Sequence, residues 1–144
     1  MNDSIRTDTA PAPVGTYPHA RKIGELLFLS GIGPRKPGTD AIPGNVLDAL
    51  GNLIDHDIAA QTRQVFANVR AVLEASGAAW EDLADVTVFL TDMAGDFKAY
   101  NAVWRECFPD PATAPCRTTL GISALPTPIA IELKCIARIR GDGC

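Results

Sequence analysis

An arginine and a glutamate near the C-terminal end have the residue types needed to hydrolyse a small carboxylic acid. Arg117 follows a proline-rich turn, and Glu132 lies in a later segment that alternates between apolar and polar residues. A guanidinium can hold a carboxylate by two parallel hydrogen bonds. A carboxylate on a rigid strand can hold and polarise a water molecule. Together, the pair could place a carboxylic acid beside a nucleophilic water. The alternative is a solvent-facing strand with ordinary exposed charges.

Residues 128–140 are expected to form the strand that carries Glu132. Successive side chains on a strand point to opposite faces, so residues of one parity share a face. One parity predicts a core face and comprises Ile129, Ile131, Leu133, Cys135, Ala137 and Ile139. The other parity predicts a polar face and comprises Ala130, Glu132, Lys134, Ile136, Arg138 and Arg140.

Two amphipathic helices are expected earlier in the chain. The first runs to about Glu74, can be capped by Asp55 or Asp57, and can end in a left-handed conformation at Gly77. Its apolar stripe has helical spacing and comprises Ile58, Thr62, Val65, Val69, Val72 and Leu73. The second helix is expected to begin at Asp96, a candidate cap. Its stripe comprises Phe97, Tyr100, Trp104 and Cys107 or Phe108. Both stripes are interpreted as core.

Further strands are expected at 22–30, 82–91 and 118–123, and a long connection covers 35–55. The order of strands, helix, strand, helix and strands predicts an α+β fold, with one mixed sheet and two helices packed on one face. The helices would cover the apolar parity of the last strand. The opposite face, with Glu132 and Lys134, would then need a partner, which a closed symmetric oligomer supplies.

Size and composition indicate one globular domain. The chain has 144 residues, of which 47% are hydrophobic and 21% charged. Residues 1–13 are polar and contain prolines, so a flexible N-terminal arm is expected there. The formal net charge of −4 argues against a nucleic-acid or anionic-membrane partner. The sequence has no bilayer-length apolar run and no secretory signal, so a cytoplasmic location is expected.

The cysteines and histidines do not form a metal-binding pattern. Cys107, Cys116, Cys135 and Cys144 have no Cys-x-x-Cys spacing, and the chain has two histidines. No metal site is expected, and the cysteines are interpreted as free thiols of a reducing compartment. Cys116 lies beside Arg117, where a cation favours the thiolate. A nucleophilic role would also need a base, and no histidine is close in sequence.

An ordered set of short motifs resembles the Rid family, the reactive-intermediate (enamine/imine) deaminases. The C-terminal part of the resemblance comprises Pro115-Cys116-Arg117-Thr118-Thr119, Leu125-Pro126 and Ile131-Glu132-Leu133-Lys134. The earlier part comprises Gly15-Thr16-Tyr17, Leu29-Ser30-Gly31, Gln61-Thr62-Arg63 with Asn68-Val69, Val86 to Leu90, and Phe97 with Tyr100-Asn101. Together they extend from about Gly15 to Arg140. No single motif is specific, but their order and the spacing from Arg117 to Glu132 are.

The resemblance implies a chorismate-mutase-like fold in which three subunits close a central barrel. Active sites would lie in clefts between subunits of a homotrimer or a dimer of trimers. Arg117 would bind the substrate carboxylate and Glu132 would position the attacking water, with neither metal nor organic cofactor. An enamine would tautomerise to its imine before water attacks the C=N carbon and ammonia leaves.

The resemblance also implies secondary site residues. Tyr17 would edge the pocket from a neighbouring subunit, although a packing tyrosine bonded to a backbone carbonyl is equally compatible with the sequence. The Ser30-Gly31 turn would lie near the substrate, or simply end a strand. Asn101 would lie near the active site. The remaining candidates are Cys116 and Thr119, through backbone N–H groups, and Lys134.

Three departures from the generic pattern bear on the substrate. Thr119 stands where many small-imine members have cysteine, Lys134 stands where many have an acidic residue, and the 35–55 connection is longer. With Tyr17-Pro18-His19, these features look like the 2-aminomuconate deaminase branch, which forms 4-oxalocrotonate and ammonia during aromatic-compound degradation. Its substrate has two carboxylates, so a second cation would be needed. The candidates are Lys134, Arg35, Lys36 and His19.

Several alternatives remain open at the level of sequence. The protein could be a generic deaminase of 2-aminoacrylate or 2-iminopropanoate, or an RNA-binding, ribonuclease-type relative, which the acidic balance disfavours. His19 and Asn68 are each expected at the surface, with a pocket or subunit-boundary role as the alternative. Arg35 and Lys36 are each expected in a solvated turn unless they contact the substrate.

Overall fold

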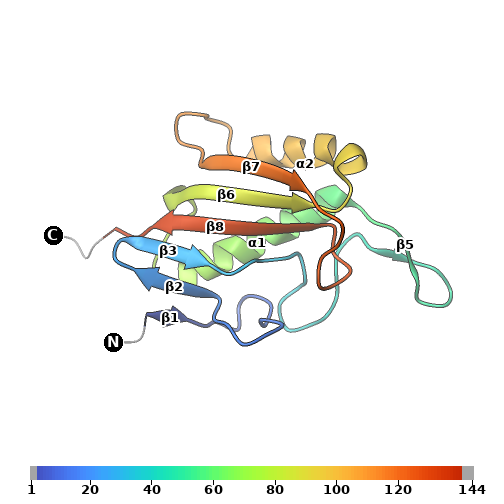
Figure 1. Ribbon diagram of the computed structural model, residues 1–144, viewed down its shortest axis with the longest axis horizontal. Coiled ribbons are helices and arrows are strands. Elements are labelled where there is room, and N and C mark those ends of the chain that lie inside the picture. Colours follow the sequence, from blue (N-terminus) through green and yellow to red (C-terminus); the bar gives the residue numbers. More distant parts are fainter. Residues whose placement is uncertain (1–2, 141–144) are drawn as a thin grey trace.

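The structure is a computed structural model that describes residues 3–140. One six-stranded sheet forms the centre of the molecule, in the order β1-β2-β3-β8-β6-β7. The strands are β1 (Ser4–Ile5), β2 (Ala20–Ile23), β3 (Leu26–Leu29), β6 (Leu83–Leu90), β7 (Cys116–Gly121) and β8 (Ile131–Arg138). β6 and β7 are parallel, and the other neighbours are antiparallel (Figure 1).

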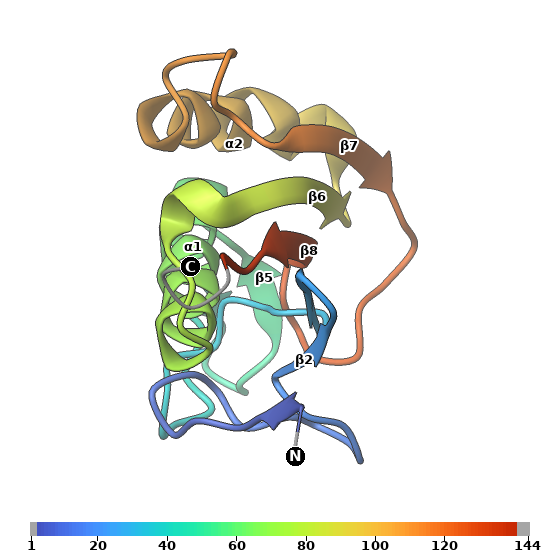
Figure 2. The same ribbon diagram turned by 90° about the vertical axis from the view of Figure 1, so that its left-hand side faces the viewer.

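Two helices, α1 (Ile58–Ala75) and α2 (Met93–Cys107), cover one face of this sheet (Figure 2). A short 3-10 helix, Trp80–Asp82, precedes β6. The mixed sheet and its one-sided helical layer confirm the predicted α+β architecture. No helix within residues 3–140 has the length and apolar character needed to cross a bilayer.

The first helix agrees with its sequence signals. The side chain of Asp57 accepts a hydrogen bond from the Ala60 backbone N–H, so Asp57 is the cap rather than Asp55. After the last turn, Gly77 has a φ of 80°, and the Ala78 N–H donates to Leu73 O at 2.8 Å. Such a left-handed residue is the commonest way to satisfy the last carbonyls of a helix.

The predicted start of the second helix was wrong. Asp92 is the cap, and its carboxylate accepts from the Gly95 N–H at 3.1 Å. Asp96 lies inside the first turn, is buried, and its Oδ2 is 2.7 Å from His56 Nε2. Two aspartates at consecutive turn positions are equivalent as local signals, and the contact with His56 from a distant segment distinguishes them.

The predicted strand at 22–30 is instead a hairpin of β2 and β3. Ile23 pairs with Leu26, and the turn between them uses Gly24 at a φ of 60°. Glycine has no Cβ, so it adopts this conformation without steric cost. A hydrophobicity pattern does not predict β2 as a strand of its own, because two of its four residues, Arg21 and Lys22, are charged. β7 also begins earlier than predicted, at Cys116 rather than Thr118.

The last strand has the predicted division into two faces. The buried parity, which packs under the helices, comprises Ile131, Leu133, Cys135 and Ala137. Glu132, Lys134 and Ile136 are half-buried on the other face. The faces of β8 therefore match the sequence pattern, and Glu132 lies on the side of the sheet away from the helices.

The first residues of the chain lie against the sheet. Ser4 and Ile5 pair with Arg21 and Ala20, and Ala10 is buried in the core cluster. Composition alone predicted a flexible arm at 1–13, but these contacts place 3–13 along an edge strand and across a pocket. Met1 and Asn2 of that arm lie outside the described residues, as does Cys144.

The long connection contains a small separate hairpin. β4 (Val46–Leu47) and β5 (Leu53–Asp55) form a two-stranded sheet that extends away from the main body (Figure 1). Its apolar side chains are exposed and comprise Val46, Leu47, Leu50, Leu53 and Ile54.

Candidate active site

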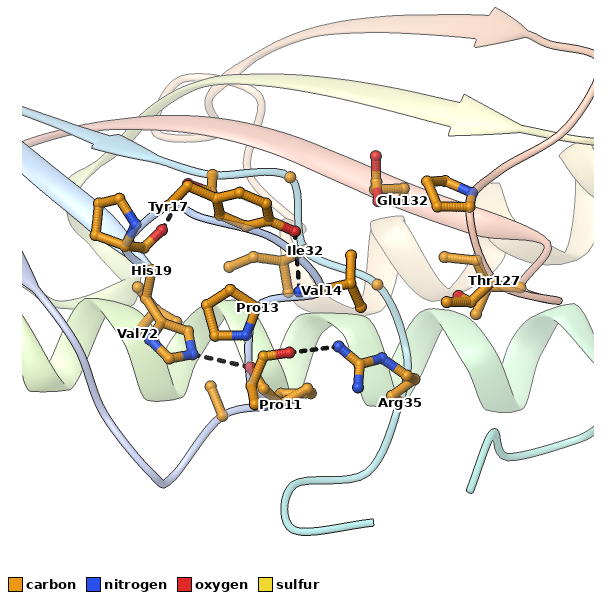
Figure 3. Close-up of a pocket in the computed structure, with 18 residues that line it drawn as sticks. Pro11, Pro13, Val14, Tyr17, His19, Ile32, Arg35, Val72, Thr127 and Glu132 are labelled. Atoms are coloured by element: carbon orange, nitrogen blue, oxygen red, sulfur yellow. Dashed lines mark hydrogen bonds between the residues drawn. The ribbon is translucent and has the colours of Figure 1, made fainter. Parts of the chain in front are cut away.

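Glu132 lines a cavity of about 220 Å³, and Val72 of α1 is among the other residues that line it (Figure 3). The walls come from the N-terminal segment 10–14, the entry to β2, the turn after β3, Arg35 and the loop 126–129. The backbone of Gly31 lies directly beside the Glu132 carboxylate, because a Cβ built at position 31 would lie 2.9 Å from Glu132 Oε2. The absence of a side chain at position 31 therefore leaves room for the carboxylate.

The carboxyl group of Glu132 lies in a partly dehydrated environment. Burial raises its pKa above the ordinary glutamate value, because loss of solvent disfavours the charged form. Lys134 shares this face of β8, but its Nζ donates to the Leu29 carbonyl. Within residues 3–140 no cation forms an ion pair with Glu132. The carboxylate is therefore available to accept a proton or to hold a water.

Two predicted pocket residues, Tyr17 and Ser30, line the same cavity. The Tyr17 hydroxyl accepts a hydrogen bond from the Val14 N–H at 3.2 Å, so the tyrosine is both a packing residue and a pocket residue. The hydroxyl keeps its own proton for donation. Ser30 Oγ donates to Pro18 O at 2.7 Å, which ties the turn after β3 to the entry of β2.

The expectation that His19 lies at the surface was wrong. His19 is 7% exposed. Its Nδ1 accepts from the Thr7 N–H at 3.3 Å, so Nε2 carries the proton and donates to Pro11 O at 2.8 Å. Both ring nitrogens are used to hold the N-terminal segment against the cavity. The short-range sequence could not indicate these partners, which lie 8 and 12 positions away.

A second cluster surrounds Arg117 at the edge of the sheet. Arg117 Nη1 donates to Asn101 Oδ1 at 2.8 Å. The guanidinium also lies over the rings of Trp104 and Tyr100, with its carbon 4.9 and 5.5 Å from their centroids. Such cation–π contacts stabilise a charged side chain in one orientation. α2 thus contributes two aromatic rings and one side-chain amide that contact the Arg117 guanidinium.

Thr119 belongs to this second cluster. Its Oγ1 lies 3.2 Å from the hydroxyl of Tyr100, and burial raises the pKa of that phenol. Helical spacing in the sequence predicts Tyr100 and Trp104 only as members of the core stripe of α2. Their additional contact with Arg117 had no local signal, because it depends on α2 packing beside β7.

The two clusters lie on opposite faces of the sheet. Arg117 pairs with Val86, whose side chain is buried under the helices. Glu132 pairs with Phe89, which has the opposite parity on β6. Paired residues project to the same side, so Arg117 faces the helices and Glu132 faces away from them. Within one chain, the guanidinium and the carboxylate therefore do not face a common pocket.

Cys116 and Lys134 belong neither to the lining of the Glu132 cavity nor to the Arg117 cluster. Cys116 pairs with Asp85, has the parity opposite to Arg117, and its side chain is exposed. Its thiol therefore faces the other side of β7 from the Arg117 cluster. Cys107, Cys116 and Cys135 are free thiols, and burial raises the pKa of Cys135 to about 12. Residues 3–140 contain no cluster of three or more His, Cys, Asp or Glu side chains suited to a metal.

Asn68 and Arg35 both lie in less exposed positions than the sequence predicts. Asn68 is 1% exposed, which overturns its predicted surface position. Its Nδ2 donates to Gly33 O at 2.9 Å and to Arg35 O at 2.7 Å. Arg35 lines the cavity, whereas the neighbouring Lys36 is exposed and does not. Arg35 therefore belongs to the same cavity as Glu132.

Comparison with known proteins gives the family of the chain. Residues 7–139 match the family described as Endoribonuclease L-PSP. A RutC family protein of Pyrococcus horikoshii is 39% identical over 95% of this chain and 98% of that protein. The 2-iminobutanoate/2-iminopropanoate deaminase of Escherichia coli is 34% identical over 95% of this chain and 98% of its own.

A solved structure also matches nearly the whole chain. The crystal structure of Escherichia coli TdcF with bound serine superposes with a TM-score of 0.80, at 30% identity, over 95% of this chain and 98% of that one. Matches of this extent and identity define common descent as well as a common fold. The chain accordingly belongs to the Endoribonuclease L-PSP family, which includes the RutC proteins and the reactive-intermediate (Rid) deaminases.

Proposed function

We propose that this protein is an imine/enamine deaminase that hydrolyses 2-imino acids to 2-oxo acids and ammonia. The observation that carries the proposal is the half-buried Glu132, which lines a cavity without a cationic partner among residues 3–140. Its neighbour Gly31 leaves space beside the carboxylate. A raised carboxyl pKa suits a group that must take up a proton and return it during one turnover.

The residues divide the reaction between them. Arg117, fixed by Asn101 and Trp104, binds the carboxylate next to the reacting carbon. Glu132 accepts a proton from a water as that water attacks the C=N carbon. The carbinolamine then receives a proton on nitrogen, the C–N bond breaks, and ammonia leaves as the C=O bond forms. One water is consumed, and no redox step occurs.

The opposite orientations of Arg117 and Glu132 favour a site shared between subunits. A homotrimer, alone or as a dimer of trimers, would bring the Arg117 cluster of one subunit to the Glu132 cavity of the next. The helix-free sheet face has apolar side chains for such a contact. Those that are exposed comprise Ile23, Leu26 and Leu120. Barrel closure through this face would bury them.

The comparisons favour short imino acids as the first substrates to test. The E. coli relative is named for 2-iminobutanoate and 2-iminopropanoate and aligns with 95% of this chain. 2-Aminomuconate is the second candidate, and its support is a single observation. Arg35 places a cation in the cavity that Glu132 lines, which suits a substrate with a second carboxylate.

Ribonuclease activity is the competing function, because the matching family carries that description. The net charge of −4 and the use of Arg117 in an aromatic cluster disfavour an RNA surface. RNA also contains no imino acid, so its cleavage would not use a water held by Glu132 to attack an imine carbon. The two functions therefore make different demands on Glu132.

The test is hydrolysis of imines generated in solution. An amino-acid oxidase converts L-alanine or L-2-aminobutanoate to the imine, and ammonia release is followed with and without the protein. We expect acceleration by wild type and losses of about 10²-fold or more for Glu132→Ala and Arg117→Ala. Glu81→Ala and Arg105→Ala, at exposed positions, are matched controls. RNA cleavage unaffected by both active-site variants, without imine hydrolysis, would overturn the proposal.

A further inference from the structure

The loop that precedes β8 forms one wall of the Glu132 cavity. Pro126, Thr127 and Ile129 of this loop line the cavity, and Figure 3 draws Thr127 and Glu132 on the same side of it. β8 begins at Ile131, so Glu132 is the second residue of its strand. The position of the Glu132 carboxylate therefore depends on how the end of this loop is held.

Ala130, the last residue before β8, is held through both of its backbone polar groups. Its N–H donates to Gln61 Oε1 at 2.9 Å, and its carbonyl accepts from the Thr91 N–H at 3.2 Å. Gln61 belongs to α1 and is fully buried, as is its contact with Ala130. A buried N–H that loses its partner has no water to replace it. The Gln61 side chain therefore fixes the junction between the loop and the strand that carries Glu132.

The other end of the Gln61 amide reaches the long connection before α1. Gln61 Nε2 donates to Asn45 Oδ1 at 2.8 Å, and Asn45 Nδ2 donates to Pro128 O at 2.9 Å. Asn45 directly precedes β4, so it lies at the base of the β4–β5 hairpin. The two amides form one chain of hydrogen bonds, which holds the loop at both Pro128 and Ala130. Such connected polar groups fix a single arrangement of the segments that they join.

A second amide of α1 fixes another wall of the same cavity. Asn68 follows Gln61 by seven positions, a spacing that places both side chains on one face of the helix. Asn68 Nδ2 donates to Gly33 O at 2.9 Å and to Arg35 O at 2.7 Å, and its Oδ1 accepts from Gln64 Nε2 at 3.0 Å. This face of α1 thus holds the backbone of two walls, and Gln61 is the member that reaches the strand of Glu132.

We infer that Gln61 is a positioning residue for Glu132, which acts through the Ala130 N–H and, together with Asn45, holds loop 126–130 in the arrangement that water activation requires. This inference rests on the proposed deaminase function and adds a residue to it. The side chain of Gln61 is not one of those that line the cavity within residues 3–140, so its effect on the reaction is indirect.

This role predicts a loss of turnover without a loss of carboxylate binding. A displacement of about 1 Å at a reacting group can reduce the rate about 10²-fold. Arg117 projects to the other face of the sheet and has no contact with the Gln61 amide among the hydrogen bonds of residues 3–140. The competing explanation is that Gln61 only stabilises the fold. Its loss would then lower the melting temperature, and the folded variant would keep its kcat.

The test replaces Gln61 by methionine, which has a similar length but makes neither hydrogen bond. We expect kcat for 2-iminobutanoate to fall at least about tenfold, while calorimetric binding of 2-oxobutanoate stays within threefold of wild type. Thr62→Val is the matched control, because Thr62 is equally buried and its hydroxyl donates within α1, to Ile58 O at 2.7 Å. It should keep kcat within twofold. Wild-type kcat in Gln61→Met, or an equal loss in Thr62→Val, would overturn the inference.

A second variant keeps the test decisive if Gln61→Met does not fold. Asn45→Ala removes the contact with Pro128 from a half-buried position and leaves the contact between Gln61 and Ala130 in place. We expect its kcat to fall at least about threefold. Asn52→Ala is its control, because the Asn52 amide bonds to Asp48 within the hairpin. Wild-type kcat in Asn45→Ala would overturn the inference whether or not Gln61→Met folds.

Titration of Glu132 separates this inference from the proposed function, because it needs no catalysis. Burial raises the pKa of Glu132 in the wild-type protein. A loosened loop admits water, so the carbon-13 carboxyl signal, assigned by its absence from Glu132→Gln, should titrate closer to the ordinary glutamate range in Gln61→Met and Asn45→Ala. It should be unchanged in Thr62→Val. Identical titration in all variants would overturn the positioning role even if imines are hydrolysed. Failure of wild type to hydrolyse any imine would overturn the deaminase function alone.

Discussion

Nη1 of Arg117 lies 2.8 Å from Oδ1 of Asn101, so an uncharged amide on α2 aims the guanidinium of β7. The rings of Trp104 and Tyr100 make cation–π contacts with the same guanidinium. The amide accepts a hydrogen bond without neutralising Arg117, so the guanidinium keeps its charge for the substrate carboxylate of the proposed reaction. A carboxylate at position 101 would instead form an ion pair with Arg117 in the unliganded protein.

Replacement of Asn101 by alanine should therefore weaken substrate binding more than folding. A hydrogen bond to a charged group contributes about 1.5–3 kcal/mol, which corresponds to at least about tenfold in KM. Asn101→Asp should be more harmful because it forms an ion pair with Arg117. Steady-state kinetics with 2-iminobutanoate measure the effect. Asn52→Ala, in the β4–β5 hairpin, is the control, and equal KM values for Asn101→Ala and wild type would contradict the assigned role.

The raised pKa of Glu132 predicts a specific pH dependence. The ionised carboxylate is the form that accepts a proton from water, so kcat/KM should decline as the pH falls through this elevated pKa. The acid limb should therefore lie above the ordinary glutamate range and should be absent from Glu132→Gln, whose residual activity should be reduced about 10²–10⁴-fold. An acid limb at the same pH in Glu132→Gln would assign it to another group.

The same group gives a stability prediction of defined sign. Because burial raises the folded-state pKa of Glu132, the charged form destabilises the native state, and this cost is absent below the unfolded-state pKa. The cost develops as the pH rises through the folded-state pKa. Glu132→Gln should therefore melt at a higher temperature than wild type near pH 8, and the difference should diminish toward pH 4. A melting difference independent of pH would contradict this origin.

Local patterns predicted much of the architecture but not the relations between distant segments. The parity of 128–140 predicted the two faces of β8, and Gly77 marked the end of α1, whereas its start was left open between Asp55 and Asp57. The β2–β3 hairpin was missed because β2 has little apolar character. Asp92 and Asp96 could be distinguished only through His56, which reaches Asp96 from a segment 40 positions earlier.

For the candidate site too, local patterns predicted the residue types but not the relations between distant segments. Motif resemblance predicts Arg117 and Glu132 as site residues, but it cannot give the faces to which their side chains project. That geometry follows from the pairing of Arg117 with Val86 and of Glu132 with Phe89, both long-range properties of the sheet. Similarly, the burial of His19 and Asn68 follows from backbone carbonyls that other segments present to them. Single polar residues without such partners belong at the surface, which explains the incorrect expectations.

Gly31 offers a test of the space around Glu132. A Cβ at position 31 would lie 2.9 Å from Glu132 Oε2 and 3.1 Å from its Cδ, so Gly31→Ala should displace the carboxylate. The side chain can move at its flexible end, so folding should be little affected. A misplaced catalytic group should nevertheless reduce kcat about 10–100-fold. The matched control is Gly121→Ala, whose new Cβ would meet its nearest atom at an ordinary 3.6 Å. Wild-type kcat in Gly31→Ala would contradict the close approach.

Mixing two inactive variants tests whether the site is shared between subunits. Arg117→Ala lacks the guanidinium of the Arg117 cluster and keeps the Glu132 cavity, whereas Glu132→Ala has the reverse defect. If each site combines Arg117 of one subunit with Glu132 of its neighbour, random trimers formed from equal amounts should recover about one quarter of wild-type sites. The variants are co-refolded or co-expressed, and ammonia release is measured against each variant alone.

The recovery has a built-in control, because a chain carrying both substitutions cannot complement either variant at the shared site. Mixing the double variant with wild type should only dilute activity, in proportion to intact Arg117–Glu132 neighbours. Sedimentation establishes that the mixtures are trimeric. Recovery near one quarter would show that opposite orientations within one chain, fixed by the register of β6 with β7 and β8, become a single site on assembly. Mixed trimers without recovered activity would require both residues to act within the same subunit.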